Sequence, residues 1–120
     1  MTGVRAHPSM ANNWVESKLF FGFSFEDAPA DSLVEVRWRH FLDREVTPRF
    51  TAGLTVFDSY GQWLPRSALT PKRLRSKVLV VVYPVSAENA ERIDAIRTAW
   101  KKLTGEQSVL VVTMPAEVSF

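Results

Sequence analysis

Apolar and polar side chains alternate along residues 18–25, and this pattern predicts a β-strand with one buried face. Four apolar residues recur at every second position: Leu19, Phe21, Phe23 and Phe25. Lys18, Gly22 and Ser24 separate them, while Phe20 adds one apolar residue to the opposite face. The first strand is therefore strongly apolar on one side and mixed on the other.

Apolar residues at helical spacing predict two helices. The first has a stripe of four such residues: Val34, Trp38, Phe41 and Leu42. Pro48 lacks an amide hydrogen and disfavours helical geometry at Thr47, so this helix ends before residue 48. The second helix begins after Ser86, a good N-cap, and ends at Gly105, a favoured terminator. Its stripe contains Ala90, Ile93, Ile96, Trp100 and Leu103.

Three more segments have the pattern of strands. A second strand is predicted over residues 53–58, followed by a turn and a long basic loop that reaches residue 76. The third, over residues 77–83, is apolar on both faces and rich in valine, as expected in the middle of a sheet. The fourth, over residues 108–114, is also apolar on both faces, and Pro115 is expected to interrupt it.

The order strand, helix, strand, strand, helix, strand predicts an α+β fold of the ferredoxin-like split βαβ type (βαββαβ). This fold has a four-stranded antiparallel sheet with two helices on one face, with the first and third strands central and the other two at the edges. Residues 1–16 lack sustained periodicity and are expected to form a flexible N-terminal arm. Residues 17–120 are then a single domain.

Apolar residues occur on both sides of a sheet that has only two helices to cover it. Phe20 and the alternate valines of the third strand cannot all point toward those helices, and the fourth strand would be an apolar edge. A second copy against the bare face or edge would cover both. The pattern therefore predicts a homodimer formed through the sheet face or the edge.

Composition excludes several kinds of chemistry. Of 120 residues, 46% are hydrophobic and 23% charged, as in soluble globular domains. There is no cysteine, so disulfides, thiolate nucleophiles and cysteine-ligated metals are excluded. His7 and His40 match no metal-ligand spacing, and the chain has no glycine-rich phosphate loop and no nucleophile elbow. We therefore expect neither a metal nor a cofactor.

The charge distribution bears on partners and location. Five cations between residues 66 and 77 have no acidic residue among them, but the net charge is only +2. Sheets of this topology that bind RNA need aromatic residues on both central strands, and here only Phe20 is available, which argues against nucleic acid. No stretch approaches the length of a membrane helix and the N-terminus lacks an apolar signal core. We expect a cytoplasmic protein as supplied, with the envelope as the alternative if a leader was removed.

The stretch from Thr47 to Trp63 holds most of the unusual chemistry. Arg49 and Asp58 bracket the second strand, and an ion pair between them would either lock the loop or hold a ligand carboxylate. Gln62 and Trp63 would bind a small polar aromatic ligand or close the end of the core. With the basic loop and the third strand included, the candidate ligand-binding residues are Arg49, Asp58, Gln62, Trp63, Arg75, Lys77 and Tyr83.

Several short segments recur together in order: LFFG at 19–22, TPRF at 47–50, GLTV with a following Asp58, GQW at 61–63, SKVLVV at 76–81, SVL at 108–110 and VSF at 118–120. In these segments the chain resembles an uncharacterised family of small bacterial proteins classified as a domain of unknown function. The resemblance covers about residues 17–120. It implies no established activity. Members often carry a lipoprotein or secretory leader, which this sequence does not show.

Two functional hypotheses follow from the residues. The first is a dimeric binding or structural module without catalysis, which uses the loop around Arg49, Asp58, Gln62 and Trp63 to hold a small ligand or a protein partner. The alternative is a cofactor-free enzyme acting on a small organic substrate in a pocket of the paired ferredoxin-like sheets. In the enzyme, Asp58 or Tyr83 would move a proton and Arg49 or Arg75 would stabilise negative charge. An enclosed cavity with a desolvated carboxylate would favour the enzyme, and a paired Asp58 beside a filled core would favour the module.

Overall fold

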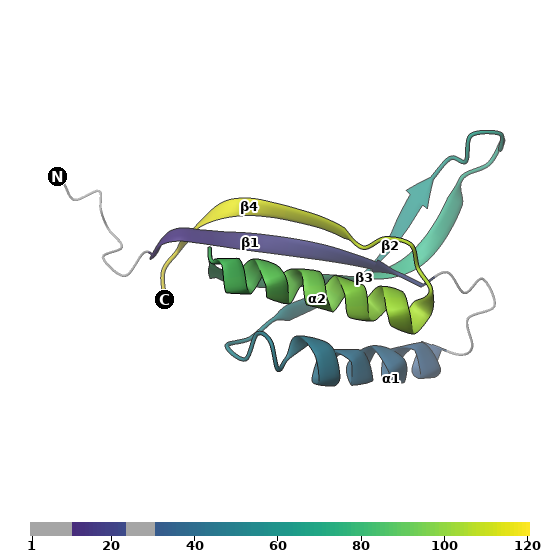
Figure 1. Ribbon diagram of the computed structural model, residues 1–120. Helices are drawn as coiled ribbons and strands as arrows, with labels where there is room; N and C mark the ends of the chain where they lie inside the picture. Colours follow the sequence, from purple (N-terminus) through teal and green to yellow (C-terminus); the bar gives the residue numbers. More distant parts are fainter. Residues whose placement is uncertain (1–10, 24–30) are drawn as a thin grey trace.

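The computed structural model describes residues 11–23 and 31–120, and Figure 1 shows how its elements are arranged. In chain order the elements are β1 (Ala11–Gly22), α1 (Asp31–Phe41), the π-helix η1 (Leu42–Val46), β2 (Thr55–Trp63), β3 (Lys72–Pro84), α2 (Ala87–Thr104) and β4 (Leu110–Val118). The predicted order of strands and helices is confirmed. Within the described residues, neither α1 nor α2 is long and apolar enough to cross a membrane.

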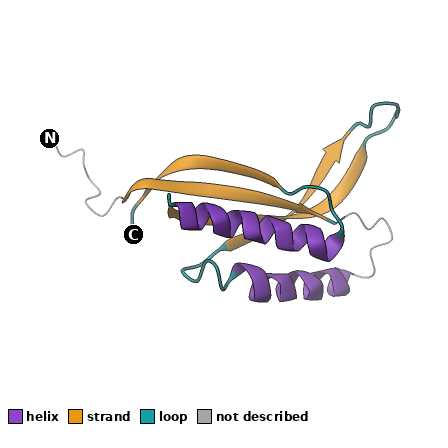
Figure 2. Ribbon diagram, in the orientation of Figure 1, coloured by secondary structure: helices purple, strands orange, loops and turns teal. Residues whose placement is uncertain are grey.

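The four strands form one antiparallel sheet in the order β2-β3-β1-β4, as predicted for a ferredoxin-like fold. β3 and β1 are central, and β2 and β4 are the edges. Both helices lie on the same side of the sheet (Figures 1 and 2). The sheet therefore has an inner face, covered by α1 and α2, and an outer face that no helix covers.

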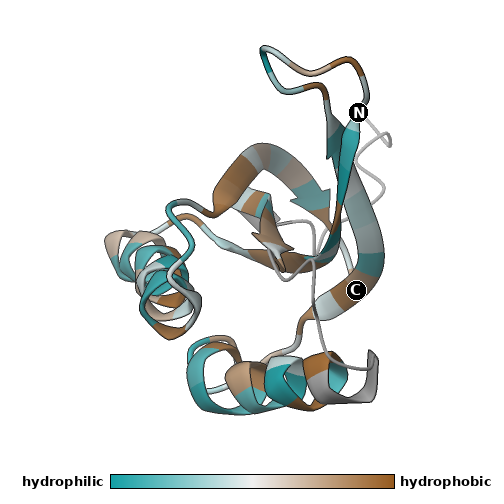
Figure 3. Ribbon diagram, turned by 90° about the vertical axis from the view of Figure 1, so that its right-hand side faces the viewer, coloured by the Kyte–Doolittle hydropathy of each residue, from teal (hydrophilic) through white to brown (hydrophobic). Residues whose placement is uncertain are grey.

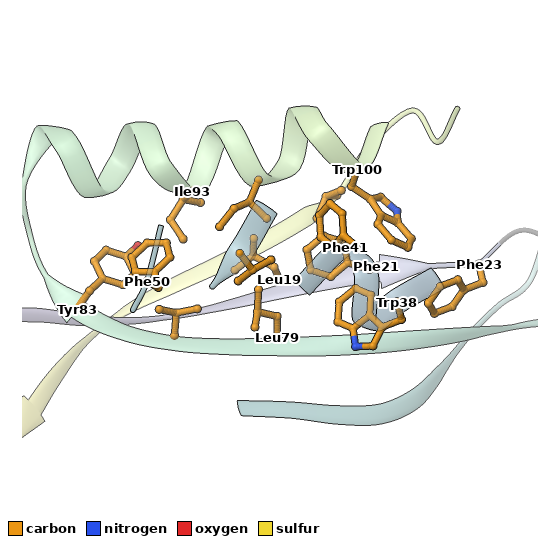
Figure 4. Packing of buried hydrophobic residues seen from close by; sticks show 14 of the residues in the cluster. Leu19, Phe21, Phe23, Trp38, Phe41, Phe50, Leu79, Tyr83, Ile93 and Trp100 are labelled. Atoms are coloured by element: carbon orange, nitrogen blue, oxygen red, sulfur yellow. The ribbon is translucent and has the colours of Figure 1, made fainter. Parts of the chain in front are cut away.

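The core lies between the inner face and the two helices, as Figure 4 shows. Phe21 of β1 contacts Trp38 and Phe41 of the first helical segment and Trp100 of α2, and the six ring pairs among these residues have centroid separations of 4.9–5.8 Å. Five of the six pairs are edge-on or tilted, the geometry favoured by ring quadrupoles. Leu19, Leu79 and Ile96 extend the core along the sheet and are completely buried.

The N-terminal part of the sheet begins earlier than predicted. β1 starts at Ala11, so residues 11–16 belong to the sheet and not to a flexible arm. The extension forms because β1 has long partners on both sides: Val15 faces Tyr83 of β3 and Pro115 of β4. The register shifts between Ala11 and Trp14, where Asn13 has a positive φ of 62°. The rest of the predicted arm, residues 1–10, lies outside the described residues.

The basic segment before the third strand is also different from the prediction. β2 continues to Trp63 and β3 begins at Lys72, with these two residues paired, so the predicted long loop is wrong over its last part and only residues 64–71 connect the strands. The side chains of Ser59 and Ser76 share a hydrogen bond of 2.6 Å across this ladder. The end of the hairpin projects away from the body of the protein (Figure 1).

The predicted interruption at Pro115 does not occur, because β4 runs through it to Val118. β4 is an edge strand and needs backbone pairing only with β1, and a proline is tolerated at such a position.

The two helices end where expected. α1 passes into η1, in which the amide of Thr47 donates to the carbonyl of Leu42 at 2.8 Å, and both end before Pro48. Ser86 Oγ accepts from the Asn89 amide at 3.0 Å at the start of α2.

The outer face of the sheet is apolar and uncovered. Its side chains come from all four strands: Phe57 of β2, Val78, Val80 and Val82 of β3, Phe20 of β1, and Leu110, Val112 and Met114 of β4. Phe57, Leu110 and Met114 are more than half exposed. Seen end-on and coloured by hydropathy in Figure 3, both helices lie on one side of the sheet, and hydrophobic residues occur along strands as well as helices. The apolar residues that the two helices cannot cover, as expected from the sequence, thus lie on the outer face of the sheet.

Candidate functional site

Lys77 is a charged residue at an inward-facing position of the sheet. β3 directs Lys77, Leu79 and Val81 to the inner face by strand alternation, and all three are buried. Lys77 is 6% exposed. A buried ammonium is costly unless it is paired and hydrogen-bonded, so its neighbours decide whether this position is stable.

Two carboxylates satisfy the Lys77 ammonium. Asp58 lies directly opposite Lys77 in the β2–β3 ladder, and Lys77 Nζ donates to its Oδ1. Glu35 reaches down from α1, and its Oε2 accepts from the same Nζ at 2.6 Å. Arg39, one helical turn on, lies 3.5 Å from the other oxygen of Glu35. Through these two ion pairs, the Lys77 ammonium links the edge strand β2 and the helix α1 to the central strand β3.

These contacts set the protonation state of Lys77. Burial by itself would lower the pKa of Lys77, but the hydrogen bonds to Asp58 and Glu35, together with their negative charges, outweigh burial and raise it. The amine is therefore held as an ammonium at neutral pH. A protonated lysine offers hydrogen-bond donors and a fixed positive charge, and it has no lone pair for nucleophilic attack or proton abstraction.

A cleft of about 470 Å³ opens beside this charge cluster. Its lining combines residues of both signs, hydroxyl groups and an apolar wall: Glu35, Asp58, Arg75, Lys77, Ser59, Ser76, Phe23 and Val34. The two carboxylates and the two cations sum to a formal charge of zero. Such a lining suits a small polar molecule with both donors and acceptors.

Arg49 lies apart from this cleft. Its Nη1 donates to both the backbone carbonyl and the side-chain Oε1 of Glu45, at 2.8 and 2.9 Å. Glu45 belongs to η1, and Arg49 lies four residues later in the turn that follows η1. Asp58 pairs with Lys77 instead, so the proposed ion pair between Arg49 and Asp58 is wrong. The sequence placed both residues at the ends of one segment, but the turn between η1 and β2 carries Arg49 toward the helices.

Tyr83 is at the opposite end of the inner face. Its ring packs against Phe50 with a centroid separation of 5.3 Å, and its hydroxyl shares a hydrogen bond of 2.6 Å with Ser17 Oγ. Ser17 Oγ is in turn 2.7 Å from Thr113 Oγ1. Ser17 is completely buried. The Tyr83 hydroxyl is thus part of a buried hydrogen-bonded chain, not of the cleft beside Lys77.

Gln62 and Trp63 are far along the β2–β3 hairpin, at the end that projects from the body. Trp63 is 48% exposed, so it does not close the core. Tyr60, on the same strand, is also exposed. The candidate residues therefore separate into four places: Asp58, Arg75 and Lys77 share the cleft, whereas Arg49, Tyr83 and the Gln62–Trp63 pair each lie elsewhere.

Glu35 is a neighbour of Lys77 that was not among the candidate site residues predicted from the sequence. It lies one turn into α1, and nothing in its local pattern indicates that it faces Lys77 across the core edge. Lys77 itself could have indicated such a neighbour, because a lysine on the buried face of a strand needs an acidic partner. Within the described ranges 11–23 and 31–120, no three His, Asp or Glu side chains are grouped closely enough to hold a metal ion.

Solved structures with the same fold cover nearly the whole chain. A phage SAM lyase, determined in complex with S-methyl-5'-thioadenosine, matches with a TM-score of 0.63 and 11% identity over 92% of this chain and 93% of its own. CutA from Synechococcus elongatus matches with a TM-score of 0.56 and 12% identity over 92% and 84% of the two chains. The periplasmic divalent cation tolerance protein CutA from Archaeoglobus fulgidus has a TM-score of 0.52 and 13% identity, covering 88% and 87%. At these identities the likeness shows the fold alone.

Sequence comparison identifies the family without assigning an activity. No curated protein matches the chain significantly. A family model described as a protein of unknown function matches residues 16–120, which include β1 from Glu16 onward and every later element. The resemblance found in the short motifs is thereby confirmed, and the chain belongs to the family of proteins of unknown function DUF3574.

Proposed function

We propose that this protein is a homodimeric ligand-binding module without a catalytic step. A second copy covers the outer face of the sheet, and the cleft beside Lys77 takes a small polar ligand. The observation that carries the proposal is the outer face itself: apolar side chains from all four strands lie open on the side of the sheet opposite the helices. Contiguous apolar surfaces of this kind are typical of protein interfaces.

The dimensions of the outer face suit a pair of copies. β2 and β4 pair at opposite ends of the sheet, so all four strands lie side by side only around Phe20, Phe57, Val78 and Leu110. With strands spaced by about 4.8 Å and rising about 3.3 Å per residue, the whole sheet, whose strands are 9–13 residues long, covers a plane on the order of 700 Å². Side chains standing on this plane enlarge its accessible area. A standard interface buries about 800 Å² on each partner, so the side-chain surface of this face approaches the size that a stable dimer needs.

The charged residues of the outer face favour a copy of the same chain as the partner. Lys18 and Glu16 form an ion pair of 3.1 Å in the middle of β1. Val80 and Val82 of β3 flank the pair on one side, and Val112 and Met114 of β4 flank it on the other. A two-fold axis near this pair brings each Lys18 close to the Glu16 of the other copy. The surface is then complementary to itself in charge as well as in hydrophobicity.

The ligand cleft is argued from its charges. A zwitterion such as a free amino acid could direct its ammonium toward Asp58 and Glu35 and its carboxylate toward Arg75 and Lys77. The enzyme hypothesis has less support. Asp58 has a side chain that is 84% exposed and is paired with Lys77, so it is not the desolvated carboxylate that the enzyme requires. Tyr83 is committed to Ser17 away from the cleft.

Light scattering coupled to size-exclusion chromatography tests the dimer at micromolar concentration. We expect a mass of twice the 13.6 kDa chain for the wild type. Val112→Asp places a charge on the outer face and should give a monomer. Val36→Asp is the matched control, because Val36 is similarly exposed but lies on α1. A monomeric wild type, or a Val112→Asp variant that remains dimeric, contradicts the proposal.

Differential scanning fluorimetry with a panel of free amino acids tests the cleft. A ligand that binds the folded chain raises its melting temperature by mass action. Asp58→Asn should remove the shift, whereas Asp94→Asn, an exposed change on α2 outside the cleft, should retain it. If no amino acid shifts the wild type, or the shift is equal in Asp58→Asn, the zwitterion assignment is wrong.

A further inference from the structure

A second groove runs between α1 and α2 and shares only Phe23 and Val34 with the cleft beside Lys77. It has a volume of about 450 Å³, within the range of small-molecule pockets. Its floor is aromatic and aliphatic, made by Phe23, Val34, Phe41 and Trp100, with Leu103 on the α2 side. Leu103 is 64% exposed although it belongs to the apolar stripe of α2. The groove therefore offers an apolar surface that the chain leaves in contact with water.

The rim of the groove is cationic on one side only. Two arginines supply this charge, Arg37 from α1 and Arg44 from η1, about two helical turns apart, and His40 lies between them. Glu45 is the acidic residue of the lining, and its carboxylate is already engaged by Arg49 at 2.9 Å. On the α2 side the polar group is Thr104, whose hydroxyl donates to the Trp100 carbonyl. An occupant thus meets positive charge along α1 and hydrocarbon beneath it.

An unsatisfied donor lies in the same lining. Among the described residues, Trp100 Nε1 is the buried side-chain nitrogen or oxygen that has no hydrogen-bond partner, although Trp100 is 2% exposed. Figure 4 shows the indole nitrogen on the side of the ring turned away from Phe21 and Phe41. Buried indole groups usually have an acceptor, and leaving one unpaired costs about 1–3 kcal/mol. The donor points to an acceptor atom supplied by a bound molecule.

We infer that this groove binds a small amphipathic carboxylate, with its apolar body on the aromatic floor and its carboxylate at the Arg37 and Arg44 side. The three features act together. An apolar molecule without charge would leave the arginines unused, and a compact inorganic anion would leave the floor in water. The inference does not depend on the dimer or on the cleft beside Lys77, because the groove shares only Phe23 and Val34 with that cleft.

Octanoate is a suitable probe, and two-dimensional NMR of the indole N–H groups is a suitable measurement. The Trp100 resonance is assigned as the one missing from Trp100→Phe. We expect octanoate to shift this resonance saturably in the full-length protein, while 1-octanol, which has the same chain without the charge, binds at least about 5-fold more weakly. An aliphatic probe has no ring current, so the shift reports the environment of the donor itself.

Variants of the rim separate specific binding from general hydrophobic adsorption. Arg37→Gln and Arg44→Gln should each weaken octanoate binding about 3- to 10-fold without loss of folding, since both side chains are exposed. Arg92→Gln is the matched control on the exposed surface of α2 and should leave the affinity unchanged. Equal binding of octanoate and octanol, wild-type affinity in the Arg37→Gln, Arg44→Gln double variant, or an unmoved Trp100 resonance at high octanoate would each overturn the inference.

Discussion

Asp58 and Lys77 face each other across the β2–β3 ladder, and the ammonium of Lys77 is held on the buried side of the sheet by Asp58 together with Glu35 of α1. The arrangement fixes an edge strand and a helix to the same central residue. It also explains why β3 tolerates a charge at Lys77, in phase with Leu79 and Val81. The first two predictions test this cluster.

Removing both carboxylates should cost more than the sum of the single changes. Asp58→Asn and Glu35→Gln each leave Lys77 with one acidic partner, and we expect each to destabilise the protein by less than about 1 kcal/mol, because both carboxylates are substantially exposed. The double variant leaves a buried ammonium without a counter-charge and should lose about 3 kcal/mol. Urea unfolding of all four proteins measures the coupling. Additive losses would show that Lys77 reaches water on its own.

Lys77 should make stability depend on pH at the alkaline end. Its pKa is raised in the folded state above the ordinary value of 10.5, so the folded chain holds this proton more tightly than the unfolded chain. The stabilisation is therefore complete below about pH 10.5 and is lost as the pH rises through the folded-state pKa. Unfolding free energies of wild type and Lys77→Met, measured from about pH 8 to pH 12, should converge with rising pH. A constant difference between the two proteins would refute the linkage.

The aromatic cluster should dominate the stability of the core. Phe21→Ala removes a completely buried ring that contacts Trp38, Phe41 and Trp100, and we expect a loss of about 3–5 kcal/mol. Phe57→Ala removes a ring of the same size that is more than half exposed on the outer face. Measured in the Val112→Asp background, where the proposed dimer is absent, it should cost less than about 1 kcal/mol. Equal losses would mean that the outer face is packed within one chain.

Thermal stability should depend on protein concentration. If a second copy covers the outer face, unfolding is coupled to dissociation, and the melting temperature rises with concentration. Calorimetry of the wild type over a hundredfold range of concentration should show this rise, whereas Val112→Asp should melt at one temperature throughout. A wild type whose melting temperature is independent of concentration would contradict the association.

Ser17 and Tyr83 should differ in the cost of losing a hydroxyl. Ser17→Ala leaves the buried Tyr83 hydroxyl without its partner and should cost about 1–3 kcal/mol. Tyr83→Phe leaves Ser17 still bonded to Thr113, so the expected loss is smaller, about 0.5–1.5 kcal/mol. Chemical unfolding of the two variants gives the order, and the reverse order would mean that the main hydrogen-bond partner of the Tyr83 hydroxyl is not Ser17.

The fold could be predicted because local patterns and topology agree. The alternation of Leu19 and Phe21, the helical stripe that includes Trp100, and the proline at 48 each specify an element, and the order of elements leaves few ways to connect them. The ends of the strands could not be predicted in the same way. Residues 11–16 and 72–76 have weak patterns of their own and are extended because neighbouring strands supply hydrogen-bond partners.

The candidate site was predicted only in part, since it depends on contacts between distant elements. Asp58, Arg75 and Lys77 were identified from their charge and position, and they share a cleft. Glu35 was missed because its approach to Lys77 depends on how α1 crosses the sheet. The groove between the helices was missed for the same reason: Arg37, Arg44 and Trp100 have ordinary helical patterns, and only the packing of α1 and η1 against α2 brings them together.

The hydroxyl groups of Tyr83, Ser17 and Thr113 come from three adjacent strands, β3, β1 and β4, and meet on the inner face. Because side chains alternate along a strand, sliding any one of these strands by a single residue would turn its hydroxyl to the opposite side and break the chain. A slip by two residues would keep each side chain on its own face, and the valines of the outer face would accept it, since Val78, Val80 and Val82 are alike. The same two-residue slip would still move a hydroxyl by about 6.6 Å and separate it from its partner. Three small polar groups thus select one alignment of the sheet from several that hydrophobicity alone would allow.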